Sequence, residues 1–171
     1  LNAKGEEITD FYEETIKGDF LDGVGSVRKI NVKEEYFKAI KDGLKFGDKR
    51  IKAVLDPGNG TTSIILKDLY SMFPIDFTII NGESDGTFPN HHPDPSIEAN
   101  LEQLKKKVLE TGADIGVSFD GDGDRVGVIT NEGKFLPCDY YMILIIRDII
   151  DKVKNKTFLY DVKCSKSLED E

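Results

Sequence analysis

The stretch Asp120-Gly121-Asp122-Gly123-Asp124-Arg125 places three carboxylates at every second position and fills the gaps between them with glycines. Alternate side chains of an extended backbone point to the same side, so the spacing predicts that Asp120, Asp122 and Asp124 share one face. The two glycines can adopt backbone angles closed to other residues, which lets the loop curl and bring the carboxylates together. Three anionic groups at one point repel one another unless a cation lies between them. The stretch therefore predicts a metal site.

The chemistry of the donors indicates which kind of metal to expect. Oxygen-only ligands such as Asp120, Asp122 and Asp124 suit Mg²⁺, Ca²⁺ or Mn²⁺ rather than Zn²⁺, and Arg125 adds a planar cation of the kind that binds phosphate. Asp-Gly pairs also form ordinary turns without any ligand. An EF-hand loop is the other alternative, but it requires Gly and Glu where this chain has Arg125 and Asn131. We expect a Mg²⁺-type site.

Composition limits the class of protein. The 171 residues are 39% hydrophobic and 32% charged, as in a soluble globular chain. The net charge of −9 argues against nucleic acid or an anionic membrane surface as a partner, and no apolar run approaches the roughly 20 residues of a membrane span. Cys138 and Cys164 form no zinc or disulfide pattern, which predicts a reducing, cytoplasmic location. Because the chain begins with Leu1 rather than Met, we expect it to be part of a longer protein.

Strand and helix patterns alternate on both sides of the acidic loop. Apolar runs predict parallel strands over 49–56, 75–80 and 114–119, and helical periodicity predicts helices over 32–46, 61–73 and 139–154. The connection between 119 and 126 is too short for a crossover, so 126–130 is predicted to be antiparallel. We therefore predict a three-layer α/β/α fold with a small mixed sheet of three parallel strands and one antiparallel strand.

Two further elements are expected from local signals. Asp94 and Pro95 predict a helix start, with Asp as N-cap and Pro at the first helical position. The expected buried stripe of that helix has helical spacing: Ile97, Leu101, Leu104 and Val108. Residues 157–161 predict a fifth strand that opens another domain.

Right-handed crossovers place the loops that follow the three parallel strands on one edge of the sheet. The glycine-rich turn 56–63, the long loop 81–95 and the acidic loop should therefore share a rim. The turn can bind an anion through its N–H groups, but we favour a helix cap made by its hydroxyls. His91 and His92 are neighbours that diverge in an extended loop, so we favour loop packing over metal binding for both.

The chain resembles the α-D-phosphohexomutases, and most closely the phosphomannomutase/phosphoglucomutase branch. The resemblance rests on residues 87–95 (Thr-Phe-Pro-Asn-His-His-Pro-Asp-Pro), 120–128 and 161–165 (Asp-Val-Lys-Cys-Ser), and it runs from about residue 22 to 166. The first of these stretches favours this branch over the phosphoglucosamine mutases.

The resemblance implies a phosphoglucomutase-like domain in an enzyme of four domains. It implies that residues 1–32 are the tail of the first domain and a linker, 33–137 the second, metal-binding domain, and 138–171 a linking helix with the truncated start of the third. It also implies that the catalytic serine loop, the sugar-selecting loop and the phosphate-binding loop lie outside this chain, which should be inactive alone.

The implied roles fall on residues of the matched motifs. Asp120, Asp122 and Asp124 match Mg²⁺ ligands, Arg125 an arginine near the transferred phosphate, and Lys163 a lysine that reaches the active site. The implied reaction interconverts hexose 1-phosphate and hexose 6-phosphate, of mannose or glucose, through a phosphoserine and a 1,6-bisphosphate. Without the resemblance, Lys163 is most simply a solvated lysine. The alternatives are a non-catalytic cation- or phosphate-binding α/β module and an interaction domain in which the acidic turn has no ligand.

Overall fold

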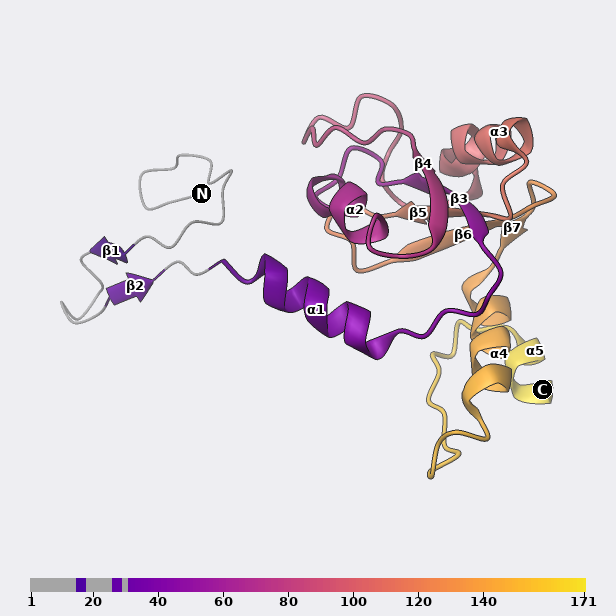
Figure 1. The fold of residues 1–171 in the computed structure, drawn as a ribbon. Helices are drawn as coiled ribbons and strands as arrows, with labels where there is room; N and C mark the ends of the chain where they lie inside the picture. The colour runs from indigo at the N-terminus through magenta and orange to yellow at the C-terminus, as the bar shows by residue number, and fades with distance from the viewer. Residues whose placement is uncertain (1–14, 18–25, 29–30) are drawn as a thin grey trace. The chain divides into compact units, whose positions relative to one another are not determined.

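The computed structural model describes residues 15–17, 26–28 and 31–171 of the chain. The chain divides into two compact units, residues 1–47 and residues 48–171 (Figure 1). The described elements of the first unit are a short antiparallel strand pair and one helix: β1 (Thr15–Lys17), β2 (Ser26–Arg28) and α1 (Lys33–Gly43). The predicted helix over 32–46 is therefore confirmed as α1.

The second unit is built on a five-stranded mixed sheet with the order β4-β3-β5-β6-β7. Its strands are β3 (Ile51–Asp56), β4 (Ile75–Ile79), β5 (Ile115–Phe119), β6 (Val126–Thr130) and β7 (Phe135–Leu136). The first three are parallel, and β6 runs antiparallel to β5, as predicted. The predicted α/β class is correct, and the one strand of this sheet that was not predicted is the two-residue β7, which pairs with β6.

The sheet separates two hydrophobic layers because successive side chains of β3 point to opposite faces. Val54 packs with α3 (Glu102–Thr111) in a cluster of fully buried residues that includes Leu104 and Val108. Leu55, its neighbour in sequence, packs on the other face with α2 (Ser63–Tyr70). The two helices thus cover opposite faces of the sheet, giving the predicted three-layer arrangement (Figure 1).

The predicted helix start at Asp94 and Pro95 is wrong. The regular helix α3 begins at Glu102, preceded by a short 3-10 helix η1 (Glu98–Leu101). Asp94 instead forms a local turn, in which its Oδ1 accepts hydrogen bonds from the backbone N–H and the hydroxyl of Ser96. Because the helix starts later, Ile97 lies outside its buried stripe and is 48% exposed.

The predicted strand over 157–161 is also not formed. These residues lack strand pairing, and Leu159 is 90% exposed. A β-strand requires a hydrogen-bonded neighbour, and no other described residue of this chain supplies one here. The segments around it are helical: α4 (Cys138–Ile149) precedes it and α5 (Lys166–Asp170) follows it.

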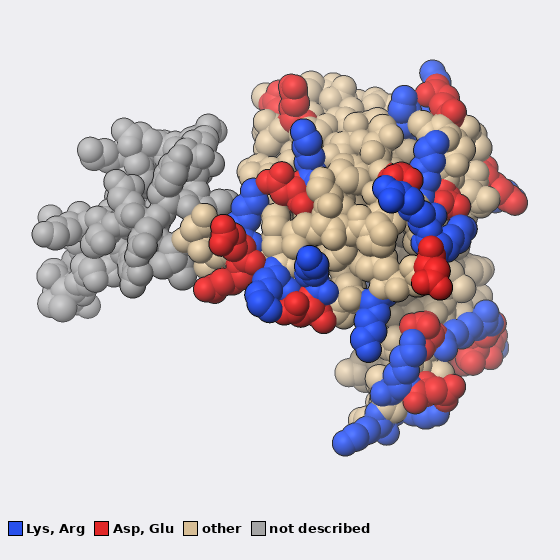
Figure 2. Space-filling view, in the orientation of Figure 1, with Lys and Arg blue, Asp and Glu red and all other residues tan. Residues whose placement is uncertain are grey.

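The exposed charged side chains contribute little to the stability of the fold. Figure 2 shows Lys and Arg interspersed with Asp and Glu on one face of the described residues. Many of them form exposed ion pairs such as Lys152–Asp148 (Nζ to Oδ2, 2.9 Å), and each pair contributes only about 0–1 kcal/mol to stability.

In the described part of the chain, no helix combines the length and the apolar character needed to cross a bilayer.

Candidate metal centre

The acidic loop is the hairpin connection between β5 and β6, and it brings the three aspartates together. One carboxylate oxygen each from Asp120, Asp122 and Asp124 lies within 4.8 Å of the other two. Asp120 is buried, whereas the other two are exposed. The carboxylates converge because the loop bends, with Gly123 at φ +81°, and not because they alternate along an extended strand.

Arg125 holds the buried carboxylate of Asp120 with two hydrogen bonds. Its backbone N–H donates to Oδ1 at 3.0 Å, and its Nε–H donates to Oδ2 at 2.7 Å. Burial by itself raises the pKa of Asp120, but these hydrogen bonds outweigh it and keep that pKa below its usual range. Asp120 is therefore an anion at neutral pH and keeps lone pairs free for a metal.

Asp124 has the opposite shift. Its pKa is raised because it shares a hydrogen bond with Asp120 and because Asp122 and Asp120 add negative charge beside it. A bound cation would relieve this repulsion. Among the residues that the structure describes, this is the one group of three acidic, His or Cys side chains close enough to hold an ion. Its oxygen-only donor set fits a hard divalent cation.

The long loop 81–95 is joined to the acidic loop through Arg125. Nη1 of Arg125 lies 3.0 Å from Oδ1 of Asp94, so one guanidinium bridges Asp94 and Asp120. The pKa of Asp94 lies below its usual value, first because the Ser96 hydroxyl and N–H donate to it and further because Arg125 is close. Two motifs that are far apart in sequence thus meet at one arginine.

The glycine-rich turn packs against the same acidic loop. The backbone N–H of Thr61 donates to the carbonyl of Gly121 at 2.9 Å, and the Thr61 hydroxyl donates to the same oxygen at 3.2 Å. Gly60 has no room for a side chain, since a Cβ there would lie 2.7 Å from that carbonyl oxygen. The prediction that the three loops share one rim of the sheet is confirmed.

The predicted hydroxyl cap on the helix after this turn is not formed. Thr62 occupies the N-cap position of α2 in a helical conformation and makes no side-chain cap hydrogen bond. The hydroxyls of Thr62 and Ser63 are buried without a hydrogen-bond partner among the described residues. The turn is instead held by the acidic loop, because Thr61 gives its donors to Gly121.

Asp56, at the end of β3, is a junction that sequence reasoning missed. Its side chain is fully buried, and Oδ1 accepts hydrogen bonds from the Gly58 N–H at 2.9 Å and from Asn81 Nδ2 at 3.1 Å. Oδ2 lies 3.0 Å from Nε2 of His91. One carboxylate therefore ties together β3, the exit of β4 and the long loop. The sequence signal that could have revealed Asp56 is an aspartate at the end of an apolar strand. Such an aspartate is buried, and a buried charge must be paired.

Asn59 is a second missed junction on the same rim. Its side chain donates to the carbonyl of Glu83 at 2.8 Å and accepts from Asn90 Nδ2 at 2.8 Å. Its own N–H donates to the carbonyl of Asn81. Asn59 has φ +62°, a left-handed conformation that Asn tolerates better than most residues.

A cavity of about 670 Å³ lies beside the acidic loop and brings together residues that are distant in sequence. Asp124, Arg125 and Lys163 line it, together with both cysteines of the chain, Cys138 and Cys164. Much of its wall is apolar, with Val126, Phe135 and Leu136 among its residues, and the few charged groups set into that wall could orient a ligand of the size of a small metabolite. The structure therefore places Lys163 in the same cavity as the acidic loop.

The segment that carries Lys163 is anchored by Asp139, another residue that sequence reasoning missed. Oδ2 of Asp139, in the first turn of α4, accepts a hydrogen bond from the N–H of Ser165 at 2.9 Å. The pKa of Asp139 is lowered by its hydrogen bonds with Ser165. Within the segment, the N–H of Lys163 donates to Asp161 Oδ1 at 2.8 Å.

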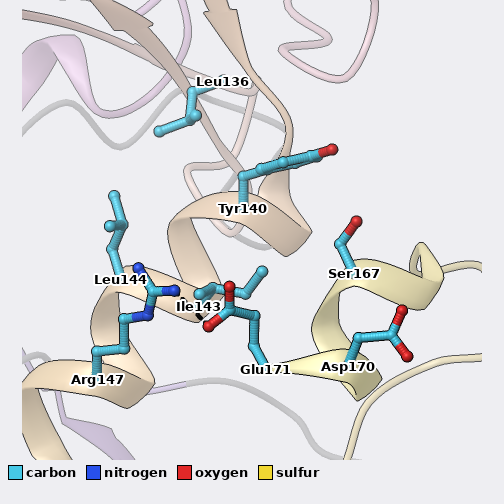
Figure 3. A pocket seen from close by; sticks show the side chains of 8 residues that line it. All are labelled: Leu136, Tyr140, Ile143, Leu144, Arg147, Ser167, Asp170 and Glu171. Carbon is cyan, nitrogen blue, oxygen red and sulfur yellow. Dashed lines mark hydrogen bonds and ion pairs between the residues drawn. The ribbon is translucent and has the colours of Figure 1, made fainter.

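A second cavity, of about 400 Å³, lies between α4 and α5 (Figure 3). Its walls include Leu136, Tyr140, Ile143 and Leu144, and an ion pair between Arg147 and Glu171 crosses it. No residue of the acidic loop lines this cavity. We therefore do not assign it to the metal centre.

The fold and the site together define an α/β/α domain with an acidic loop at the carboxyl edge of its parallel strands, in which an arginine binds the buried aspartate. The family model described as phosphoglucomutase/phosphomannomutase, alpha/beta/alpha domain II, matches residues 34–133. The chain therefore belongs to the phosphoglucomutase/phosphomannomutase family of the α-D-phosphohexomutases, as the sequence motifs indicated.

Individual relatives agree with this family. A phosphomannomutase/phosphoglucomutase of Pseudomonas syringae is 39% identical over 95% of this chain and 35% of its own length, and one of Pseudomonas putida is 42% identical over 84% and 31%. The solved structure of a phosphoglucomutase/phosphomannomutase family protein from Burkholderia thailandensis superposes with a TM-score of 0.68 at 33% identity, covering 72% of this chain and 27% of that one. The chain spans about a third of the length of the curated relatives it matches.

Proposed function

We propose that this chain is the metal-binding part of an enzyme that interconverts hexose 1-phosphates and hexose 6-phosphates of mannose or glucose. The proposal is supported by the names of the relatives, phosphomannomutase and phosphoglucomutase. The observation that carries it is the acidic loop, where Asp120, Asp122 and Asp124 converge beside Arg125.

The proposed roles follow from the chemistry of each side chain. Mg²⁺, when bound by the three aspartates, neutralises charge on a phosphoryl group in transfer. Arg125 donates hydrogen bonds to phosphate oxygens in the cavity, since its fixed fork of N–H groups suits that geometry. Lys163, in the wall of the same cavity, binds an anion or moves a proton at Nζ.

The rest of the proposal concerns the protein as a whole. A phosphoserine outside this chain donates its phosphoryl group to a hexose phosphate, and the resulting 1,6-bisphosphate returns the other one. The chain alone is inactive, because it carries neither that serine nor the sugar-selecting loop. The domain boundaries at residues 33 and 137 and the cytoplasmic location stay predictions.

An assay of the full-length protein tests the proposal. Glucose 1-phosphate and mannose 1-phosphate are followed to their 6-phosphates with and without Mg²⁺. We expect turnover that depends on Mg²⁺ and is lost in Asp122→Asn, whereas Asp148→Asn, a charge-matched change on the exposed face of α4, leaves it intact. Absence of turnover with either sugar phosphate would favour a non-catalytic cation- or phosphate-binding module.

The inactivity of the chain alone needs a separate measurement. The 171-residue chain is assayed under the same conditions, at a concentration at which a thousandth of the full-length rate is detectable. Mg²⁺-dependent turnover by the chain alone would contradict this part of the proposal.

A further inference from the structure

The imidazole of His91 lies between two hydrogen-bond acceptors. Its side chain is 10% exposed, with Nε2 at 3.0 Å from Asp56 Oδ2 and Nδ1 at 3.0 Å from the carbonyl oxygen of His92. A carbonyl oxygen can only accept, so Nδ1 carries a proton. Oδ1 of Asp56 accepts two N–H groups, and an ionised carboxylate can only accept at Oδ2, so opposite an ionised Asp56 Nε2 also carries a proton. A ring with both nitrogens protonated is an imidazolium.

The charged groups around this ring agree with a positive charge on it. Asp56, at the end of β3, is in direct contact. In the packed loops Asp94 and Arg125 form an ion pair with each other, and the other charged side chains are all acidic: Glu83, Asp85, Asp120, Asp122 and Asp124. The hydrogen bond to Asp56 is the main cause that raises the pKa of His91, although burial opposes it.

The ring is connected to the acidic loop through a short series of hydrogen bonds. The carbonyl oxygen of His92, which accepts from the His91 ring, also accepts from the backbone N–H of Asp94 at 2.9 Å. The side chain of Asp94 in turn lies 3.0 Å from Nη1 of Arg125. The position of Asp94 therefore depends on a carbonyl group that the His91 ring holds in place.

We propose that His91 is a positioning residue for Arg125. Held as an imidazolium between Asp56 and its own loop, it fixes Asp94, and Asp94 fixes the guanidinium beside the acidic loop. The importance of this for phosphoryl transfer rests on the proposed function, but the positioning itself requires neither a metal nor a sugar phosphate.

Nuclear magnetic resonance of the full 171-residue chain tests the charge on the ring. The chain has two histidines, so two sets of ring nitrogen signals are expected, and His92→Gln assigns them. About one pH unit above the ordinary histidine pKa of about 6.5, both nitrogens of His91 should remain protonated. A neutral His91 ring at that pH would overturn the proposal.

The Nη1–H signal of Arg125 tests the positioning, because Nη1 contacts Asp94 whereas Nε contacts Asp120. In His91→Gln, which keeps one donor but loses the charge and the second donor, the signal should broaden or disappear, as it should in Asp94→Asn. The matched control His92→Gln should leave it unchanged. Arg50 is an internal control for solvent exchange, because its Nη2–H also donates to a carboxylate, that of Asp76, at 2.6 Å.

The pH dependence of the unmodified chain keeps the test decisive if His91→Gln fails to fold. The Arg125 signal should change with the same midpoint as the His91 ring, while the Arg50 signal does not follow that midpoint. Equal behaviour of the two arginine signals would show that His91 only packs the loop. A failed mutase assay would leave these results unaffected, so the two proposals fail separately.

Discussion

The three aspartates of the acidic loop differ as individual residues. Asp120 is buried and held by Arg125, so removing its charge disturbs the fold as well as the site. Asp122 and Asp124 are exposed and raise the local negative charge. The proposed metal binding is therefore best tested separately from folding at Asp122.

For Asp122→Asn we expect Mg²⁺ or Mn²⁺ affinity to fall at least about tenfold, since divalent affinity depends on the number of charged ligands. The free energy of unfolding without metal should stay the same or rise slightly, because repulsion with Asp120 and Asp124 is reduced. Isothermal titration calorimetry and urea unfolding measure the two quantities. Unchanged metal affinity would favour an interaction domain whose acidic turn binds no ion.

The two glycines of the acidic loop should respond differently to substitution. Gly123→Ala should lower the free energy of unfolding by about 1–3 kcal/mol, because φ is +81° and the new Cβ would clash with Thr62 Cγ2. Gly121→Ala should be neutral or stabilising by up to about 1 kcal/mol, since its nearest contact is an ordinary 3.6 Å. Urea unfolding of both variants compares them, and equal losses would contradict this account of the loop.

The His91–Asp56 pair predicts how stability depends on pH. The folded-state pKa of His91 is raised, so its contribution is fully present below the ordinary value of about 6.5 and is lost as pH rises through the folded-state pKa. His91→Gln should therefore cost about 1.5–3 kcal/mol at low pH and less at high pH. Urea unfolding on both sides of the transition measures this difference. A cost of His91→Gln that grows with pH would contradict this assignment.

At the scale of elements, α3 is held by its buried stripe and not by a cap at Asp94. Leu104→Ala should lower the free energy of unfolding by about 2–5 kcal/mol, because Leu104 is fully buried in the hydrophobic cluster between α3 and the sheet. Ile97→Ala should cost about 0.5 kcal/mol or less, since Ile97 is 48% exposed. Thermal or urea unfolding measures both losses. Similar losses for the two variants would show that Ile97 belongs to the buried stripe.

Segments with strand-like sequences show where local pattern is insufficient. Residues 115–119 and 157–161 both have strand-forming composition, but only the first has neighbours, β3 and β6, that satisfy its backbone groups. Pairing is non-local and cannot be read from one segment. The same holds for α4, where the apolar Ile145 is 53% exposed while Asp139 is buried and accepts a hydrogen bond from Ser165.

At the scale of the whole molecule, the division at residue 47 predicts that residues 48–171 fold independently. Deleting residues 1–47 should change Tm by no more than about 3 °C, which corresponds to about 1 kcal/mol at this size. A chain of residues 33–171 is the matched comparison, because it retains α1. If residues 33–171 unfold cooperatively and residues 48–171 do not, α1 is needed for folding, and the domain boundary predicted at residue 33 would be supported.

Much of the candidate site was predictable because its signals are local. The alternation of Asp and Gly, the oxygen donor set and the arginine that follows are properties of six consecutive residues. The three parallel strands and the antiparallel hairpin also follow from periodicity and from a connection too short to cross over. The α/β/α class and the acidic loop were therefore determined by the sequence itself.

Only the tertiary structure decided which distant residues meet. The pairing of Asp56 with His91, the bridge from Asp94 through Arg125 to Asp120, and the shared cavity of Lys163 and the acidic loop join positions far apart in the chain. The physical reason is that a buried polar group must find a partner, and sequence shows the need but not the partner. The packing of the three loops on one sheet edge supplies that partner.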